Sequence, residues 1–302
     1  MISPRTLWVA FPSMLGGYEK ICDLADALGF DAIAPRAGEG LGNGSFAPSL
    51  KPAEVAAMKR RGKKVYPWTF SRPQAVLAEV LAFGQYEDAG ADAVIIDAEL
   101  PWDNDPSARD HAKLYGEKLR GEVMVPIYDA PWPAIAWHPG YPEAEFRSFV
   151  DGRLVQAYWT EIGWSARKTL DVMRAQWEGK DDRLLPIGVT YGRKEMARWG
   201  SKKPPPGEIT EAELRSVAAE ITGGWYSAEA AGPGVLAIIA DSISPAPSAP
   251  EPGPTLPETP ASLLASEIRS EQAEAPEDCT TFYCRNRVAH DLYCENADTD
   301  PP

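Results

Sequence analysis

GADAVIIDAELPW, from Gly90 to Trp102, is the stretch of sequence that decides the fold. Branched apolar residues lead into two carboxylates, Asp97 and Glu99, that stand two positions apart. Because side chains alternate between the two faces of a strand, Ile95 shares a face with both carboxylates. The other face carries only apolar side chains, those of Val94, Ile96 and Ala98. We expect the apolar face to pack against helices and the acidic face to point into a barrel.

The flanking sequence repeats a pattern of short strand followed by helix. Strand-like runs are expected at 6–11, 31–37, 64–70, 92–99, 123–129, 153–159, 184–191 and 223–230. Helical patterns lie between several of them, at 18–30, 52–62, 74–90, 108–121 and 166–179. Strands joined by crossover helices pair in parallel, and eight such units are typical of a (β/α)₈ barrel of roughly 250 residues. An open doubly wound sheet is the alternative, but Gly16 and Gly17 alone do not make its phosphate-binding fingerprint.

The composition divides the chain into three parts. Residues 1–243 carry the strand and helix pattern of the barrel. Residues 244–260 are rich in proline, serine and glutamate, which predicts an extended linker. Residues 261–302 contain a short helical pattern and a tail with cysteines.

Charge and hydropathy limit the class of protein. The formal net charge is −14, which disfavours binding to nucleic acid or to an anionic membrane. The first residues do not match a secretory signal, and no apolar run is long enough to span a membrane. We therefore expect a soluble protein that is cytoplasmic when synthesised, with release by lysis or incorporation into a virion as later destinations.

The position of the two carboxylates points to catalysis. Barrel enzymes place their chemistry at the carboxyl ends of the strands, where Asp97 and Glu99 fall. Two close carboxyl groups shielded from water raise the pKa of at least one, which suits a proton donor at neutral pH. The structural alternative is a pair in which one carboxylate caps the next helix and the other bonds Arg36 or a backbone amide.

The motif DAVIIDAE resembles the signature of the chitinase-like glycoside hydrolases of family eighteen, an Asp, a Gly and then Asp-x-Asp-x-Glu. Asp92, Asp97 and Glu99 fall on the first Asp, the last Asp and the Glu. Ile95 stands in place of the middle Asp, and Ala93 in place of the Gly. The ending is also similar, more loosely, to the lysozyme-like family twenty-five.

Two later strands add to the resemblance. QAYW resembles the family's tyrosine-bearing strand, with Tyr158 on the tyrosine and Trp159 in place of an Asp. GGWYSAE resembles the strand whose tryptophan floors the sugar pocket, which gives Trp225. The resemblance implies that Glu99 protonates the glycosidic oxygen and that Asp97 orients the substrate acetamido group or stabilises the cation. Tyr158 would hydrogen-bond the same acetamido group.

Further residues near strand ends are candidates for substrate contact. If a conventional carboxylate pair operates, Glu161 or Asp129 is the second member. Flat aromatic rings suit the faces of sugars, and polar groups near them suit hydroxyls. The candidates are Trp68, Trp102, Trp132, Trp137 and Trp225, together with Gln156 and Arg36. The tyrosines Tyr66, Tyr128, Tyr191 and Tyr226 lie near them in the predicted barrel.

Two functions of different class remain open. The first is a glycosidase acting on an N-acetylhexosamine glycan, chitin-like or peptidoglycan, in the manner of phage lysins. The second is an inactive glycan-binding or structural component of an assembly such as a virion, which the replacements Ile95 and Trp159 favour. Neither needs a cofactor in the barrel, and the tail is expected to dock to a protein partner or to cell wall.

The tail places potential metal ligands within sixteen residues. They are Cys279, Cys284, His290 and Cys294. Three thiolates and an imidazole suit tetrahedral zinc, although their spacing matches no common finger. A disulfide with one thiol left over and a set of free thiols are the alternatives.

Overall fold

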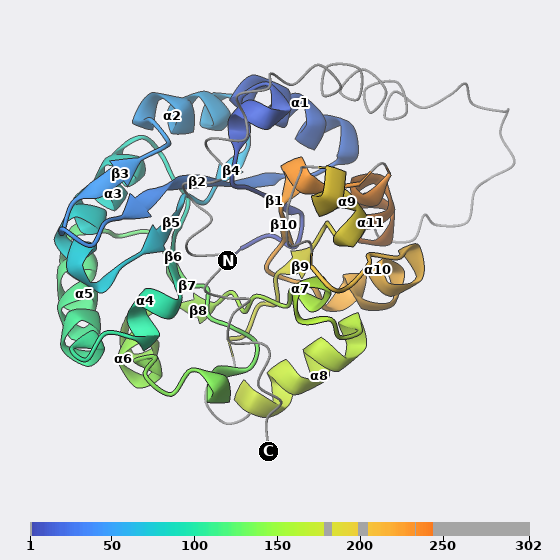
Figure 1. The fold of residues 1–302 in the computed structure, drawn as a ribbon. Coiled ribbons are helices and arrows are strands. Elements are labelled where there is room, and N and C mark those ends of the chain that lie inside the picture. The colour runs from blue at the N-terminus through green and yellow to red at the C-terminus, as the bar shows by residue number, and fades with distance from the viewer. Residues whose placement is uncertain (1, 178–182, 199–204, 233, 244–302) are drawn as a thin grey trace, which may run out of the picture.

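The computed structural model describes residues 2–177, 183–198, 205–232 and 234–243. The expected linker, 244–260, and the expected tail, 261–302, lie outside the described residues. The described chain forms a ring of strands with helices around it (Figure 1). The strands are β1 (Thr6–Val9), β2 (Ala32–Gly40), β3 (Phe46–Pro48), β4 (Lys64–Val65), β5 (Trp68–Ser71), β6 (Val94–Ala98), β7 (Ile127–Asp129), β8 (Gly152–Arg153), β9 (Gly188–Val189) and β10 (Trp225–Tyr226).

The strands pair in parallel along the path β8-β7-β6-β5-β2-β1-β10-β9. Two parallel bridges, Arg153 with Leu184 and Gln156 with Ile187, then join the two ends of that path. The backbone N–H of Leu185 donates to the carbonyl of Arg153 at 2.7 Å across this junction. The prediction of an α/β barrel is confirmed, and the fold is TIM-like.

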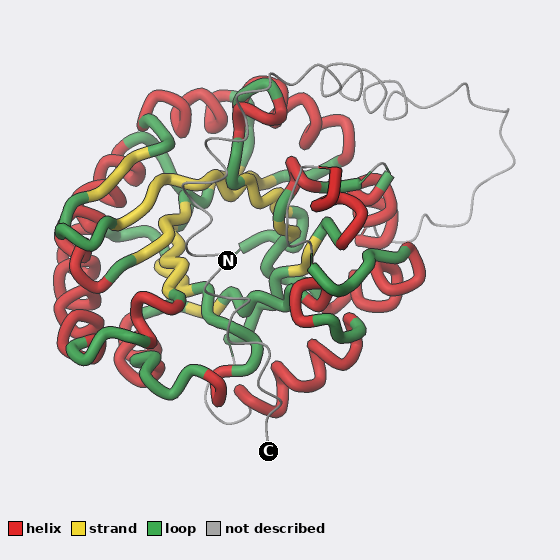
Figure 2. The backbone as a smooth tube through the Cα atoms, in the orientation of Figure 1, coloured by secondary structure: helices red, strands yellow, loops and turns green. Residues whose placement is uncertain are grey.

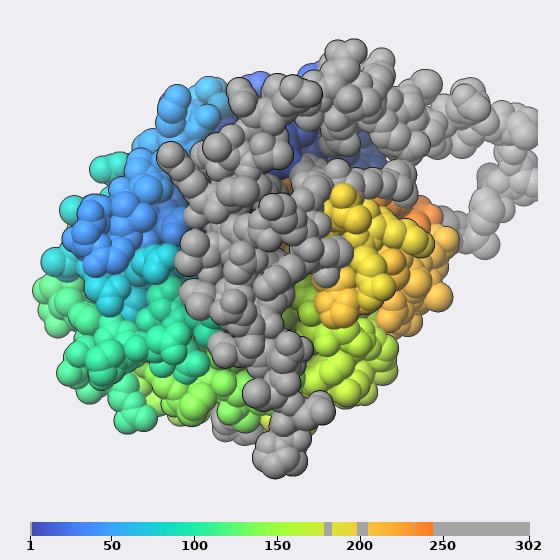
Figure 3. All heavy atoms as spheres, in the orientation of Figure 1, coloured from blue at the N-terminus to red at the C-terminus, as the bar shows by residue number. Residues whose placement is uncertain are grey.

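Helices form the outer layer, as Figure 2 shows. They are α1 (Tyr18–Leu28), α2 (Pro52–Arg60), α3 (Val76–Asp88), α4 (Leu100–Asp103), α5 (Ala108–Glu122), α6 (Glu143–Phe149), α7 (Trp159–Ile162), α8 (Ala166–Trp177), α9 (Arg193–Arg198), α10 (Glu211–Val217) and α11 (Val235–Ile243). Successive segments follow one another around the perimeter in chain order (Figure 3). In the described part of the chain, no helix is both long and apolar enough to cross a membrane.

The strands bury side chains on both faces, as a covered parallel sheet requires. The inner face forms its own cluster, which contains Trp8, Ala32, Ala34, Trp68 and Ile95. Ala32 and Ala34 are small, which leaves room inside the ring for the two indoles. The outer face joins the helices in the larger apolar cluster of the protein.

Several details differ from the sequence prediction. The expected third strand is divided into β4 and β5, because Pro67 stands between them and has no N–H to donate to a ladder. The short β3 pairs antiparallel with the end of β2 and was not expected. The helices α6, α9 and α11 were also not expected, because their patterns are short or interrupted by proline and glycine.

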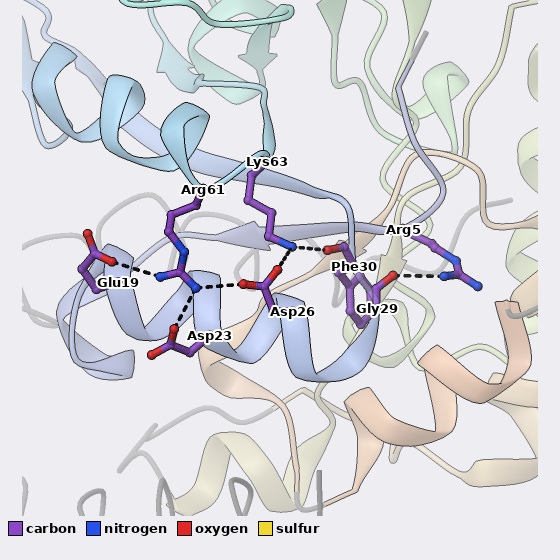
Figure 4. A network of polar contacts seen from close by, with 8 residues as sticks. All are labelled: Arg5, Glu19, Asp23, Asp26, Gly29, Phe30, Arg61 and Lys63. Carbon is purple, nitrogen blue, oxygen red and sulfur yellow. Dashed lines mark hydrogen bonds and ion pairs between the residues drawn. The ribbon is translucent and has the colours of Figure 1, made fainter. Parts of the chain in front are cut away.

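A polar network fixes α1 against the segment that follows α2 (Figure 4). The guanidinium of Arg61 bonds three carboxylates of α1, those of Glu19, Asp23 and Asp26, at 2.8 to 3.1 Å. The buried Lys63 pairs with Asp26 at 2.5 Å and donates to the carbonyl of Phe30. These contacts lower the pKa of Asp26, first through Lys63 and then through Arg61. Every charge in the network has a partner within it, so we assign it a structural role.

A second buried acid lies between the sheet and the helices. Glu79 of α3 is fully buried and accepts hydrogen bonds from Tyr115 Oη at 2.5 Å and Ser71 Oγ at 2.7 Å. The backbone N–H of Arg72 donates to its other oxygen at 3.0 Å. Burial raises the pKa of Glu79 to about 7 although these hydrogen bonds lower it. The structure therefore favours the protonated form of Glu79.

Glu79→Gln is expected to change how stability depends on pH. Because folding raises the pKa of Glu79 from 4.5 to about 7, wild-type stability from this group is full below pH 4.5 and is lost as pH rises to 7. The loss amounts to about 3 kcal/mol over that window. Denaturant unfolding of both proteins at pH 4.5 to 7.5 measures the effect. The free energy of unfolding of the variant, relative to that of wild type, should increase by this amount as pH rises. The exposed Glu122→Gln is the control, and a stability difference that does not vary with pH contradicts the prediction.

Candidate active site

The two faces of β6 separate as the sequence predicts. Val94, Ile96 and Ala98 belong to the outer apolar cluster that the helices cover. Ile95 belongs to the inner cluster, and Asp97 follows it on the same face. Glu99 comes one residue after the strand and precedes the short helix α4. The strand therefore delivers both carboxyl groups to the carboxyl-terminal mouth of the barrel.

One amide joins the two carboxylates. Gln156 Nε2 donates to Asp97 Oδ1 at 2.7 Å, to Glu99 Oε1 at 3.3 Å and to the carbonyl of Ala130 at 2.8 Å. Since the 2.7 and 3.3 Å contacts share one nitrogen, the two carboxylate oxygens lie at most 6.0 Å apart. Gln156 is buried on the barrel wall, so it holds the pair in a fixed arrangement.

The surroundings favour protonation of the pair. Burial raises the pKa of Asp97 well above its ordinary value, and the nearby charge of Glu99 raises it further. Burial also raises the pKa of Glu99 to about 7, with a smaller contribution from Glu161. Gln156 and Arg36 oppose both shifts without cancelling them. At neutral pH the pair can therefore hold a proton that a solvated Glu would have lost.

The carboxyl groups line a small pocket of about 30 Å³. Its other walls come from several strands: Trp8, Trp68, Ala130, Gln156, Tyr158 and Tyr226. The rings of Tyr158 and Tyr226 stack at 5.0 Å with their planes only 14° apart. Tyr226 also meets the edge of Trp68, at 6.2 Å and 73°. The pocket thus combines two acids with a largely aromatic wall.

The expected residues Arg36 and Glu161 lie beside this pocket. The guanidinium of Arg36 lies 5.7 Å from the centre of the Trp68 ring and pairs with Glu39 at 3.1 Å. Glu161, in α7, accepts a hydrogen bond from the hydroxyl of Tyr191. The negative charge of Glu161 raises the pKa of Glu99, and the positive charge of Arg36 lowers it.

Three expected tryptophan contacts are wrong. Trp225 is fully buried and its side chain joins the outer cluster, because the pairing of Leu7 with Trp225 places both toward the helices. Trp102 is also fully buried, stacked on Tyr115 with its indole N–H donating to Ser71. Trp132 packs beneath the imidazole of His138 at 3.5 Å. Trp137, by contrast, is 49% exposed and lies outside the pocket wall.

Asp129 is not the second carboxylate of the pocket. It is completely buried and accepts a hydrogen bond from Tyr141 Oη at 2.9 Å. The buried Arg153 lies 3.7 Å away and also pairs with Glu143. On β7 the inward positions belong to Tyr128 and Ala130, so Asp129 faces the helices.

The sequence interpretation missed Trp8, and it named Tyr226 only as one of several tyrosines near the sugar-binding candidates. Both follow from alternation, because Leu7 and Val9 face outward and leave Trp8 inside, while Trp225 faces outward and leaves Tyr226 inside. Trp8 is fixed by its indole N–H, which donates to the carbonyl of Gly223 at 2.9 Å.

The possible metal ligands of the tail, Cys279, Cys284, His290 and Cys294, lie outside the described residues. Within the described ranges, no three side chains of His, Cys, Asp or Glu come together as a metal site would require.

Comparison with known proteins gives a likeness of structure without a likeness of sequence. Neither a protein-family sequence model nor a curated protein matches the chain. A chitinase from Chromobacterium violaceum superposes with a TM-score of 0.57 at 10% identity, over 80% of this chain and 99% of that one. A family 18 N-acetylglucosaminidase from Paenibacillus barengoltzii gives 0.56 at 10% identity, over 79% and 99%.

A third similar structure is the spore cortex-lytic enzyme SleL of Bacillus megaterium, with a TM-score of 0.54 at 10% identity, over 79% of this chain and 73% of that one. The likeness to these proteins covers about four fifths of this chain and supports the resemblance seen in the sequence. The fold is that of the chitinase-like TIM barrels of glycoside hydrolase family 18.

Proposed function

We propose that the protein is a glycoside hydrolase acting on an N-acetylhexosamine glycan, either chitin-like or peptidoglycan. The observation that carries the proposal is the pair of carboxyl groups at the barrel mouth, joined by Gln156 in an aromatic pocket. Glu99 is the proton donor to the glycosidic oxygen. Asp97 orients the substrate acetamido group or stabilises the developing cation, and Tyr158 binds the same group.

The separation of the carboxylates supports one class of mechanism. Inverting glycosidases keep their two carboxyl groups about 6.5–9.5 Å apart to admit a water molecule. One oxygen of Asp97 and one oxygen of Glu99 lie at most 6.0 Å apart, which is below that range. The pair therefore suits a route in which the substrate acetamido oxygen is the nucleophile and Asp97 holds it in place. This chemistry requires the sugar and the two acids, so no cofactor enters the proposal.

The environment of Glu99 suits general acid catalysis. A proton donor works best when its pKa lies near the working pH, and burial brings the pKa of Glu99 to about 7. Gln156 donates to the carboxylates, so it stabilises whichever member of the pair is ionised. The site can thus hold one acid and one base side by side.

A second function remains open on a specific observation. Ile95 occupies the inner face where the family signature has a further Asp, and the pocket of about 30 Å³ is far smaller than the ~300 Å³ of typical ligand sites. A barrel with these features can bind a glycan end without cleaving it, as a glycan-binding or structural component of an assembly such as a virion.

Turnover separates the two functions and also gives a pH dependence. The chain is incubated with chitooligosaccharides and with purified peptidoglycan, and reducing ends are measured from pH 5 to 9. Because Glu99 must be protonated to act, kcat/KM is expected to fall tenfold per pH unit above about 7. Glu161→Gln removes a charge that raises this pKa, so it should move the fall to lower pH. Binding without release of reducing ends supports the second function, and a rate that rises above pH 7 contradicts the role of Glu99.

A further inference from the structure

An ion triad stands on the rim beside the acid pair and has no part in the mechanism above. It consists of Arg36, Glu39 and Arg72. Arg36 Nη2 lies 3.1 Å from one oxygen of Glu39, and Arg72 Nη2 lies 3.3 Å from the other. One carboxylate therefore serves two guanidinium groups, and the triad carries a net charge of +1.

The pairing of the strands places the triad next to the catalytic carboxylates. Glu39 of β2 pairs with Phe70 of β5, and Phe70 pairs with Asp97 of β6. These three residues form a row across adjacent strands at the barrel mouth. Arg36 is close enough to lower the pKa of both Asp97 and Glu99. Phe70 is the middle residue of this row, and the guanidinium of Arg72 lies 5.6 Å from the centre of its ring.

Both guanidinium groups are positioned but incompletely bonded. Arg36 packs over Trp68 and Arg72 over Phe70, so each cation is held by an aromatic face. The side chain of Arg36 is 15% exposed and that of Arg72 is 31% exposed. Among the described residues, neither Nε finds a hydrogen-bond partner although both atoms are buried. One arginine is enough to neutralise the charge of Glu39. The second arginine therefore leaves one positive charge that the triad itself does not neutralise.

We propose that this triad binds a carboxylate carried by the glycan, so that the preferred substrate is acidic and not a neutral chitin chain. Arginine matches a carboxylate with two parallel hydrogen bonds, and the triad keeps one positive charge after Glu39 is paired. The inference rests on the proposed function, because it names the substrate class of the same site.

The test compares ligands that differ in one charge. The first is peptidoglycan strands freed of stem peptides, whose lactyl groups are free carboxylates, and the second is the same strands with these groups converted to methyl amides. Chitotetraose is the neutral reference. Dissociation constants are measured by calorimetry with the full chain carrying Glu99→Gln, so that no ligand is cleaved.

The acid is expected to bind about five- to tenfold more tightly than its amide at low salt, because one charged contact on a partly exposed rim gives an effect of this size. Adding Arg72→Gln should reduce the preference to less than about twofold and leave chitotetraose unchanged, while Arg72→Lys should keep only part of it, because lysine keeps the charge but not the paired hydrogen bonds. Arg60→Gln is the control, because it removes one exposed charge from the end of α2.

Each outcome bears on one of the two proposals. Equal binding of acid and amide, or a preference that survives Arg72→Gln, overturns the role of the triad and leaves the hydrolase standing. A preference for the acid in a protein whose wild-type form cleaves none of the three ligands supports the triad and overturns the hydrolase. Failure to bind all three ligands overturns both.

Discussion

Glu99→Gln is expected to lower kcat on chitooligosaccharides or peptidoglycan by roughly 10²- to 10⁴-fold, the usual contribution of a general acid. The substituted amide keeps the size of the side chain and can still contact Gln156, but it has no proton to give to the leaving oxygen. KM should change little, because the aromatic wall of Trp8, Trp68 and Tyr226 is untouched. Initial rates of reducing-end release at pH 6 measure the effect.

Two controls make the loss interpretable. The thermal unfolding temperature of Glu99→Gln should equal that of wild type or be slightly higher, since the variant removes a buried acid whose pKa burial has raised. Glu122→Gln makes the same chemical change on an exposed face of α5 and should keep full activity. A Glu99→Gln protein that retains its rate within about threefold is incompatible with Glu99 as the proton donor.

The barrel could be predicted because its signals are local and repeated. Each of the eight expected strand ranges overlaps a strand of the sheet, although only by Arg153 in the range 153–159. The helices α1, α2, α3, α5 and α8 lie within the ranges expected for them apart from one residue at the end of α5. Gly29, Gly62 and Gly90 stand where helices end and have positive φ values of 72°, 75° and 99°. The division at Pro67 and the antiparallel β3 depend on pairing between strands, which local periodicity does not contain.

The site could be predicted where a strand is long and regular. In β6 the alternation runs through five residues, so the inward direction of Asp97 followed directly from the sequence. The strand that contains Trp225 has only two residues, and the strand that contains Asp129 has three. Such short strands show little alternation, so Trp225 was assigned from the family resemblance and Asp129 from its position at a strand end. A shift of one position reverses the face, which is why Tyr226 lines the pocket and Trp225 does not.

The role of Asp129 could not be predicted either, because it depends on a charged partner that is distant in the sequence. A carboxylate at the end of a barrel strand is typical of a catalytic residue, yet this one faces the helices and lies near the buried guanidinium of Arg153. Arg153 Nη2 also donates to the carbonyl of Glu143 at 2.8 Å, and the guanidinium lies 4.8 Å from the centre of the Trp177 ring. The partner that decides the role of Asp129 is 24 residues away in the sequence, in β8. No local pattern reveals such a partner.

The second large effect is expected from Arg153→Met, which should reduce the free energy of unfolding by about 3–5 kcal/mol. Methionine fills much of the space and keeps a contact with Trp177, but it removes the guanidinium that lies 3.7 Å from the completely buried Asp129. Burial of an unpaired carboxylate costs far more than the weak net gain of a buried ion pair, so the removal of one partner is the severe change. Urea unfolding at pH 7 measures the loss.

The double variant Asp129→Asn with Arg153→Met distinguishes a structural acid from a catalytic one. The amide removes the buried charge and can still accept the hydrogen bond of Tyr141, so more than half of the lost stability should return. Because Asp129 lies outside the pocket, the double variant should also hydrolyse glycan at a rate close to that of wild type. If stability returns while hydrolysis is lost, Asp129 acts in the reaction and the pair formed by Asp97 and Glu99 is incomplete without it. If stability does not return, the uncompensated charge is not the cause of the loss, and the cavity left beside Trp177 is.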